Sequence, residues 1–570
     1  MQTMSKRWLV ADEISPDAER ALHGYHPVLR QILYNRNLTT HEAARAFLSA
    51  QLPEGAEPWV MLGIPTAVER IRWAIDHDEP IAVYGDYDVD GVTATALLKQ
   101  VLESLGARVL GYIPNRFDEG YGLNIEALDS LHAEGVRLVV TVDCGIRSLA
   151  EAEHARRLGL DLIVSDHHHP GRQLPDAEAV INPKQSGDEY PDKNLAGVGL
   201  AYKLACALLE QGHDSRRQIP GADDYLDLVA LGTVADIAPL IGENRALVRE
   251  GLGQIRRTRR QGLLSLIGVS GLKYDKVSAS DIGFVLGPRL NAAGRLDSAL
   301  ASLNLLLTED VMEAGRLAQL LDGQNRERQQ ITRDMQTRAT ELALAEDPEA
   351  LLLFAADPDF NPGVVGLAAS RLTEAFYRPS IVAQKGEDFT RGSCRSIPEF
   401  HITEALDTCA DLLEHHGGHK AAAGFTVRTE RLPALIERLQ CVAREQLTGL
   451  DLRPMLYADL ELPLSELKPE ILKYLDWLQP TGQANPQAVF VSRGLQVAHS
   501  RPVGRDGAHL KLSVTDGRIT YDAIAFRQGH WHEAMPAQVD VMYNYEINEF
   551  NGNRYLQLNV IDLKPSGLPD

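Results

Sequence analysis

The chain has few cysteines and no long apolar run, and both features limit the classes of protein to which it can belong. Its 570 residues include five cysteines, none of them in a CxxC pair or at metal-ligand spacing. This excludes a disulfide framework and fits reduced thiols in the cytoplasm. No run of about 18 apolar residues occurs and the first residues lack a signal-peptide core, so we expect no membrane span and no export. The chain also lacks low-complexity tracts and repeats of fixed period, which argues against a repeat array.

Basic residues are outnumbered by acidic ones. The chain has 57 Lys and Arg against 79 Asp and Glu, a net charge of −22. Taken over the whole chain, this balance argues against a nucleic-acid partner. The argument weakens if carboxylates build an active site, because basic residues can still line a local groove. The length predicts about two to four domains.

One acidic stretch organises the rest of the sequence. The apolar residues at 81–85 are followed by Asp86, Asp88 and Asp90 at alternate positions, and then by a helix-like segment. The apolar run predicts a buried parallel strand, whose carboxyl end is where open α/β sheets bind ligands. Three carboxylates this close repel one another, and Mg²⁺ or Mn²⁺ would relieve that repulsion. The alternative is a polar turn without a metal.

Strand-like and helix-like segments alternate from about residue 65 to 240. The strand candidates are 81–85, 107–113, 138–143, 161–165 and 179–182, and the helix candidates lie near 66–77, 92–105, 124–134, 147–158, 196–211 and 223–235. Such alternation predicts an α/β fold with a parallel sheet covered on both faces.

Further polar side chains close other apolar segments of this region. They are Asp143 after RLVVTV, the run Asp166, His167, His168 and His169 after DLIVS, and Asp236 within LVALGTVADIAPL. A single Asp at a strand end is more often a helix N-cap, and a single His is more often a satisfied surface or core group. Several such positions on one predicted edge favour a site instead. Asp with neutral His suits Mn²⁺, and a shared carboxylate suits a two-metal centre.

Longer stretches carry a specific resemblance. YIPNRFDEGYGL, SDHHHPG, INPKQ, LAGVGLAYKL, ALGTVADIAPL and GPRLNAAGRLDS occur in that order and resemble the RecJ family of the DHH phosphoesterase superfamily. The resemblance covers residues from about 65 to 430 and extends less closely to 570. It implies a single-strand-specific 5′ to 3′ exonuclease of DNA recombination and repair that uses two divalent metal ions, Mn or Mg.

The resemblance also implies roles for individual residues. The expected metal ligands are Asp88, Asp90, Asp143, His167 and Asp236, with Asp143 as the bridging carboxylate. Asp86 is expected to bind metal or to orient the other ligands. Asp166 and His168 are expected to orient ligands or face the substrate, and His169 to be an ordinary loop histidine. Some superfamily members carry a histidine where this chain has Tyr84, so one metal site is expected to have fewer protein ligands.

The expected substrate-binding residues come from several motifs. They are Arg116, Arg289, Asn291, Arg295, Ser393, Arg395 and His419. Arginine forks suit phosphate oxygens, and the small residues around them allow close approach. For GPRLNAAGR the alternative is a Gly-rich turn with surface arginines. We expect RGSCRS to be a small-residue loop and HHGGHKAAAGF a glycine-rich turn.

The whole chain is therefore predicted to have five parts. These are a helical lead-in at 1–64, a DHH catalytic domain at 65–300, a long connecting helix at 301–347, an α/β DHH-associated domain at 348–448 and an OB-type barrel at 449–570. In the barrel, the aromatic residues that are candidates for stacking on DNA bases are Tyr521, Phe526, Tyr543, Tyr545, Phe550 and Tyr555. Half or more of these six are expected to be core residues instead.

Single-stranded DNA is the expected partner, with a helicase and a single-strand-binding protein as candidate partners and no membrane. Two other functions stay open. One is a phosphodiesterase for short oligonucleotides or cyclic dinucleotides, which would need neither the bridge helix nor the barrel. The other is an inactive DNA-binding scaffold, which would be expected to have lost metal ligands.

Overall fold

The structure is a computed structural model that describes residues 5–115, 122–211, 220–296, 298–550 and 552–568. It divides into two compact units. The small unit comprises Met1–Arg7, Asn291–Ser298 and Gln319–Met455, and the large unit comprises Trp8–Leu290, Ala299–Ala318 and Leu456–Asp570.

The first part of the large unit is a five-stranded parallel sheet in the order β3-β2-β4-β5-β6. Its strands are β2 (Ile81–Gly85), β3 (Val109–Tyr112), β4 (Leu138–Val142), β5 (Asp161–Ser165) and β6 (Ala179–Ile181). Every residue of β2 and β4 is buried, as expected when helices cover both faces of a parallel sheet. The alternation predicted from the sequence is confirmed, with the strands at the predicted places.

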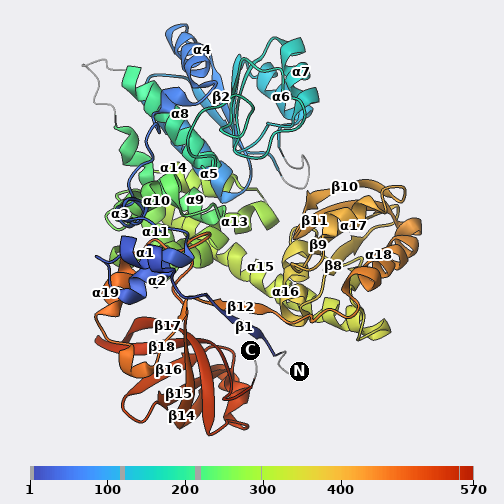
Figure 1. Cartoon of the computed structure of the whole chain (residues 1–570). Coiled ribbons are helices and arrows are strands. Elements are labelled where there is room, and N and C mark those ends of the chain that lie inside the picture. The colour runs from blue at the N-terminus through green and yellow to red at the C-terminus, as the bar shows by residue number, and fades with distance from the viewer. Residues whose placement is uncertain (1–4, 116–121, 212–219, 297, 551, 569–570) are drawn as a thin grey trace. The chain divides into compact units, whose positions relative to one another are not determined.

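Helices cover this sheet on its two faces (Figure 1). On one face lie α4 (Ile64–Asp76), α5 (Val89–Ser104) and α8 (Gly197–Gln211), and on the other lie α6 (Ile125–Ala133) and α7 (Leu149–Leu158). The chain then continues through α9 (Leu226–Ala235), α10 (Gly242–Ile255), α11 (Gln261–Val269), α12 (Ala279–Asp281), the π-helix η4 (Ile282–Leu286), α13 (Gly287–Leu296) and α14 (Leu300–Leu307). GPRLNAAGR therefore lies in a helix, and the Gly-rich turn considered as its alternative is wrong.

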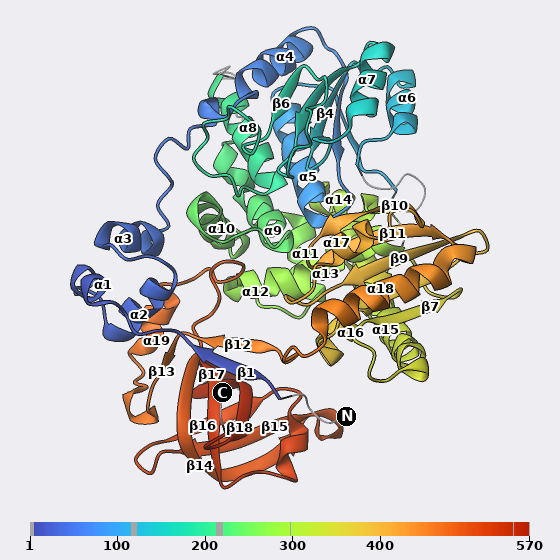
Figure 2. The ribbon, with the colours of Figure 1, turned by 45° about the vertical axis from the view of Figure 1, so that its right-hand side comes forward.

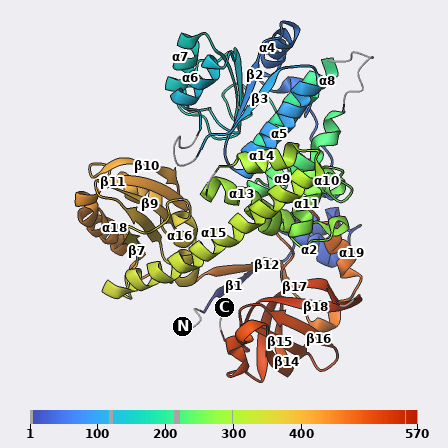
Figure 3. The same cartoon turned by 180° about the vertical axis from the view of Figure 1, so that it is seen from behind.

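The long helix predicted at 301–347 begins later, as α15 (Val311–Glu346), which has 36 residues and can be followed in Figure 3, whereas residues 301–307 belong to α14. The chain passes from the large to the small unit within this helix. No proline interrupts it, and its apolar residues recur at helical spacing, which explains its length.

The small unit is built on a second five-stranded sheet, in the order β10-β11-β9-β8-β7. The strands are β7 (Leu353–Asp357), β8 (Ser380–Lys385), β9 (Phe389–Arg395), β10 (Leu413–His419) and β11 (Ala422–Arg428), with helices α16 (Val365–Phe376), α17 (Ile402–Asp407) and α18 (Leu432–Leu447). Only β7 and β8 pair in parallel.

Two predictions for this unit are wrong. RGSCR lies in β9 rather than in a loop, and HHGGH lies in β10 rather than in a turn. Pairing with β8 and β11 overrides the weak strand preference of glycine and serine.

The C-terminal part of the large unit is a closed barrel. The strands β14 (Phe490–Val503), β15 (His509–Thr515), β16 (Thr520–Ala525), β18 (Asn553–Pro565) and β17 (Gln538–Phe550) follow one another around it, and β17 pairs back onto β14. This closure leaves no free edge among these five strands and agrees with the predicted OB fold. Tyr521, Tyr543 and Tyr545 are core residues, whereas Phe526 and Tyr555 are exposed.

The N-terminal segment packs on this barrel (Figure 2). Its elements are β1 (Arg7–Val10), α1 (Pro16–Ala21), α2 (Pro27–Asn35) and α3 (His41–Ser49), and Thr40 is the N-cap of α3. Leu29, Ile32 and Leu33 share one apolar core with the barrel interior. The strand β1 pairs with β12 (Met455–Ala458), a contact between segments distant in sequence that sequence reasoning missed. Among the described residues, no helix is long and apolar enough to cross a bilayer.

Candidate metal centre and substrate site

Acidic side chains stand at one edge of the parallel sheet. Asp86 follows β2, Asp143 follows β4 and Asp166 follows β5. Because the strands are parallel, their carboxyl ends meet at the same edge. Asp143 adopts the left-handed backbone region at φ 63°, which turns the chain sharply out of the sheet.

The next two aspartates are held by helix N-termini. Asp88 caps α5, and its carboxylate accepts hydrogen bonds from the backbone N–H of Asp90 at 2.9 Å and of Gly91 at 3.1 Å. Asp90 is fully buried, and its carboxylate accepts the backbone N–H groups of Gly197 and Val198 at the start of α8, both at 2.7 Å. The N-termini of two helices therefore hold two carboxyl side chains.

His167 lies at the centre of the group. Its Nε2 is 3.2 Å from Oδ1 of Asp143, 3.7 Å from Oδ2 of Asp236 and 3.9 Å from Oδ2 of Asp90. Asp236 reaches this point from the C-cap of α9. Residues from four separate segments, up to 146 positions apart in sequence, thus converge on one imidazole nitrogen.

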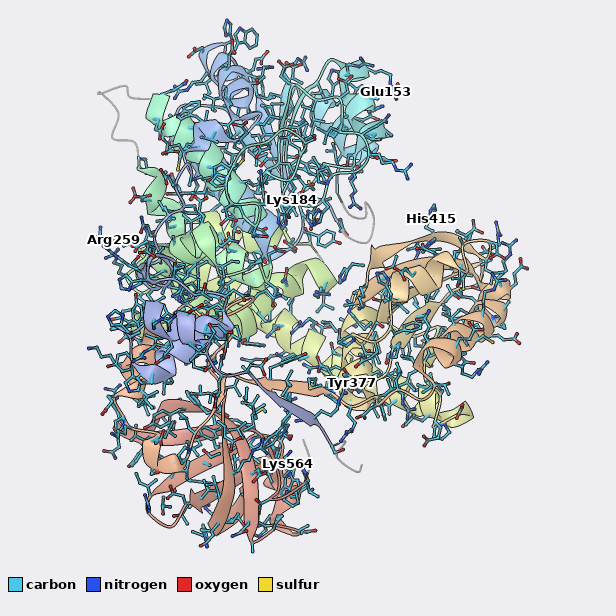
Figure 4. The ribbon with its side chains drawn as sticks, viewed as in Figure 1. Glu153, Lys184, Arg259, Tyr377, His415 and Lys564 are labelled. Carbon is cyan, nitrogen blue, oxygen red and sulfur yellow. The ribbon has the colours of Figure 1, made fainter. Side chains whose placement is uncertain are left out.

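Hydrogen bonds with neighbouring segments hold the loop that carries His167 and His168. One carboxylate oxygen of Asp166 accepts the backbone N–H of His168 at 3.0 Å and its ring Nδ1 at 2.7 Å, while the other accepts the N–H of Ile146 at 2.9 Å. Asn182, directly after β6, donates its side-chain amide to the carbonyl of His168 at 2.8 Å. Lys184 (labelled in Figure 4) donates to the carbonyl of His167.

The electrostatics of this group favour a cation. Burial, together with the neighbouring carboxylates, raises the pKa of Asp90 to about 7 and that of Asp236 to about 9. The same causes raise the pKa of Asp143 well above its usual range. Burial lowers the pKa of His167 to about 3 and so favours the neutral imidazole that binds metals.

The side chains present fit divalent ions. Potential ligand atoms lie within 4.8 Å of one another in three groups: Asp86, Asp88 and Asp143; Asp90, His167 and Asp236; and Asp143, His167 and His168. Within the described part of the chain, Oδ1 of Asp143 and Nε2 of His167 are buried and make no hydrogen bond. Buried polar atoms of this kind need a partner, and Asp with His is a donor set that suits Mn²⁺.

Tyr84 is not turned toward this group. Its hydroxyl donates to the carbonyl of Gly122 at 2.9 Å and accepts the side-chain amide of Asn124 at 3.0 Å, and its ring stacks on Tyr112. The side chain is fully buried in the apolar cluster beneath α6 and α7. Tyr84 therefore has a packing role.

The small unit brings two of the expected substrate-binding residues into contact. Nη1 of Arg395 donates to Oγ of Ser393 at 3.1 Å, and both side chains lie over Gly366 at the start of α16. His419 is in register with Arg395 across β11, so both side chains lie on the same face of the sheet.

The other expected substrate residues lie on α13 or outside the described structure. Nη1 of Arg289 donates to the carbonyl of Val285 at 2.8 Å, and Nη1 of Arg295 donates to that of Gly363 at 3.3 Å. Asn291 is half-buried on the same helix. Arg116 falls outside the residues that the structure describes.

Sequence reasoning missed three residues beside the metal group. Asn182 and Lys184 support the histidine loop, and they lie in INPKQ, a motif that follows β6 and could have indicated them. The third is Gly197, where a Cβ atom would come within 2.6 Å of Cβ of Asp143. Only the fold reveals that close approach.

Comparisons with known proteins give matches to the same family along most of the chain. Residues 80–233 match the DHH family, N-terminal domain, residues 349–445 the DHHA1 domain, and residues 458–562 the RecJ OB domain. The single-stranded-DNA-specific exonuclease RecJ of Bacillus subtilis is 39% identical over 94% of this chain and 68% of its own length. The enzyme of the same name from Escherichia coli is 38% identical over 95% of this chain and 96% of its own.

Solved structures of the same family superpose on this chain. RecJ of Thermus thermophilus in complex with Mn²⁺ superposes with a TM-score of 0.84 at 33% identity, over 99% of this chain and 80% of that one. Its complex with Mg²⁺ gives a TM-score of 0.78 at 31% identity, over 99% of this chain and 79% of that one. On its sequence and its fold, the chain belongs to the RecJ family of single-stranded-DNA-specific exonucleases.

Proposed function

We propose that this protein hydrolyses the phosphodiester bonds of single-stranded DNA from the 5′ end, with two divalent metal ions, Mn²⁺ or Mg²⁺. One observation carries the proposal: the unpartnered, buried Nε2 of His167 and Oδ1 of Asp143 lie 3.2 Å apart among carboxylates. The Thermus relative was solved with each of these ions, and the donor atoms here suit both.

Two groups of side chains would hold the two ions. One consists of Asp86, Asp88 and Asp143, and the other of Asp90, His167 and Asp236. Asp143 lies within reach of both groups and would bridge them. The bound ions would supply a water of lowered pKa and would stabilise negative charge on the reacting phosphate.

The protein itself would orient the ligands. The bond from Asp166 to Nδ1 of His168 fixes that ring and leaves its other nitrogen to face the substrate. The backbone N–H groups at the starts of α5 and α8 would hold the carboxyl groups of Asp88 and Asp90 in place. Substrate would be held by Arg116, Arg289, Asn291, Arg295, Ser393, Arg395 and His419.

The parts of the chain would divide this work. We assign catalysis to residues 65–300, substrate binding to 348–448 and strand binding to the barrel at 449–570, with the helical segment at 301–347 as their connection and 1–64 as a helical lead-in. The protein would act in the cytoplasm in recombination and repair. There a helicase would expose single strands and a single-strand-binding protein would cover them.

A single oligonucleotide labelled separately at each end tests the proposal. With Mn²⁺ or Mg²⁺ the 5′ label should leave first as mononucleotide, and chelator should stop the reaction. Asp143→Ala and His167→Ala should be inert, whereas His169→Ala, an exposed neighbour in the same triplet, should retain activity. Release of the 3′ label first would overturn the polarity, and binding without cleavage under either metal would leave a DNA-binding scaffold.

A further inference from the structure

Arg245 is a buried arginine outside the metal centre. It lies on α10 and is 1% exposed. Its guanidinium donates to five backbone carbonyls, those of Phe47, Trp477, Leu478, Gln479 and Pro480, at 2.8 to 3.1 Å. It also lies over the ring of Phe47 at 4.0 Å. All five N–H donors of the side chain are used.

This cation has no acidic partner among its described contacts. Burying a charge without a counter-ion is costly unless its hydrogen bonds are complete. The carbonyls of 477–480 follow directly after α19 (Ile471–Asp476), where the negative end of a helix favours a cation. The 477–480 turn is therefore shaped around this guanidinium.

Arg245 joins two parts of the large unit. We call residues 8–50 and 456–568 the barrel body, because α2, α3 and the barrel share one apolar core. We call residues 65–290 the metal lobe. As far as the structure describes it, that core contains no side chain of the metal lobe. Among the described side chains, Arg245 makes five hydrogen bonds from the metal lobe to the barrel body, whereas Arg249 and Lys276 make one each.

The same segment leads to a metal-binding carboxylate. Asp236 ends α9, and a short loop runs from it to α10. In that loop Ile237 adopts φ 61°, which is strained for a β-branched residue. The N–H of Leu240 donates to the carbonyl of Gln483 in the barrel body at 2.8 Å. The barrel body thus holds the segment between Asp236 and Arg245 at two points.

We propose that Arg245 is a positioning residue that fixes the barrel body against the metal lobe. A single strand held on the barrel would then reach the metal centre in one register. Polar interfaces between domains ordinarily permit relative motion, and the gain from linking two binding sites is lost when their geometry is not held. This inference rests on the proposed function, because it needs a strand that contacts both parts.

The test compares a short substrate with a long one. Arg245→Gln is assayed with Mn²⁺ on a dinucleotide, which we expect to bind without the barrel body, and on a strand of several tens of nucleotides. We expect the KM for the long strand to rise about tenfold or more, with dinucleotide turnover unchanged. Lysine has three N–H donors in place of five, so the KM of Arg245→Lys for the long strand should lie between those of the wild type and Arg245→Gln.

The control is Arg256→Gln at the C-cap of the same helix, where Nε donates to the carbonyl of Val277 inside the metal lobe. This variant should alter neither the KM for the long strand nor the turnover of the dinucleotide. Equal losses on both substrates by a folded Arg245→Gln, or an unchanged KM on the long strand, would overturn the inference.

A milder variant decides the matter if Arg245→Gln does not fold. Phe47→Leu removes the ring against the guanidinium but keeps every hydrogen bond. It should raise the KM of the long strand by about threefold, as expected for a lost cation–π contact, and leave the dinucleotide unaffected; equal effects on both would refute the inference. If the wild-type protein cuts neither substrate, the proposed function fails, and binding of the long strand by the variants then tests the inference alone.

Discussion

A single methyl group at Gly197 should disable the metal centre. Gly197 begins α8, and its N–H donates to Asp90. A Cβ atom there would lie 2.6 Å from Cβ, 2.8 Å from Oδ1 and 2.9 Å from Cγ of Asp143. Gly197→Ala therefore presses on the proposed bridging carboxylate while leaving every ligand chemically intact.

The size of the effect follows from these distances. Carbon atoms make ordinary contact at about 3.5 to 4.0 Å, so Asp143 and α8 must separate by about 1 Å. Metal sites tolerate about 0.2 Å in ligand position. A misplacement of about 1 Å costs about 10²-fold in rate, equivalent to about 2.7 kcal/mol. Asp143 already has a positive φ, so its backbone has little freedom to adapt.

Gly199→Ala, two residues further along α8, is the matched control. Its Cβ would meet only the side chain of Leu195, at 3.3 Å, which can yield. Initial rates on single-stranded DNA are measured for both variants across a Mn²⁺ titration, together with circular dichroism. We expect Gly197→Ala to lose about 10²-fold in kcat with its helix content intact. Equal rates and equal Mn²⁺ dependence in the two variants would refute the steric argument.

Three further predictions follow from the same structure. Tyr84→Phe should lower the free energy of unfolding in urea by about 1–3 kcal/mol, because a buried carbonyl and amide lose their partner; a weaker Mn²⁺ dependence of activity would contradict its packing role. Adding Mn²⁺ in excess of chelator should stabilise the protein by about 2.7 kcal/mol at 100 times the Kd, measured as a rise in Tm, and Asp143→Ala should lose most of that rise. Gly366→Ala would put a Cβ atom 2.9 Å from Nη2 of Arg395 and 3.0 Å from Oγ of Ser393, so KM for DNA should rise severalfold with Tm unchanged or higher; an unchanged KM would argue against substrate binding by that pair.

Much of the metal-binding part could be predicted from local sequence patterns. Buried parallel strands are continuous apolar runs, so β2, β4 and β5 were evident, and so were Asp86, Asp143 and Asp166 directly after them. Parallel strands place those ends at one edge whatever the details of packing. The long helix α15 was an equally local signal.

Contacts between distant segments depended on the tertiary structure. Strands β9 and β10 are rich in glycine and small residues and form because neighbouring strands pair with them. The N-terminal helices belong to the core of a barrel more than 400 residues later, and no periodicity reveals which apolar faces meet.

Single side chains also divide into those whose role could be predicted from the sequence and those whose role depends on the tertiary structure. Strand-end positions together with the family resemblance predicted that Asp143 and His167 belong to one metal site. That Tyr84 points away, that Gly197 must lack a side chain, and that Arg245 is enclosed by five carbonyls are consequences of three-dimensional packing. The sequence by itself determined the donor atoms and the sheet edge that carries them. The tertiary structure alone decided their distances, because these depend on segments brought together only by folding.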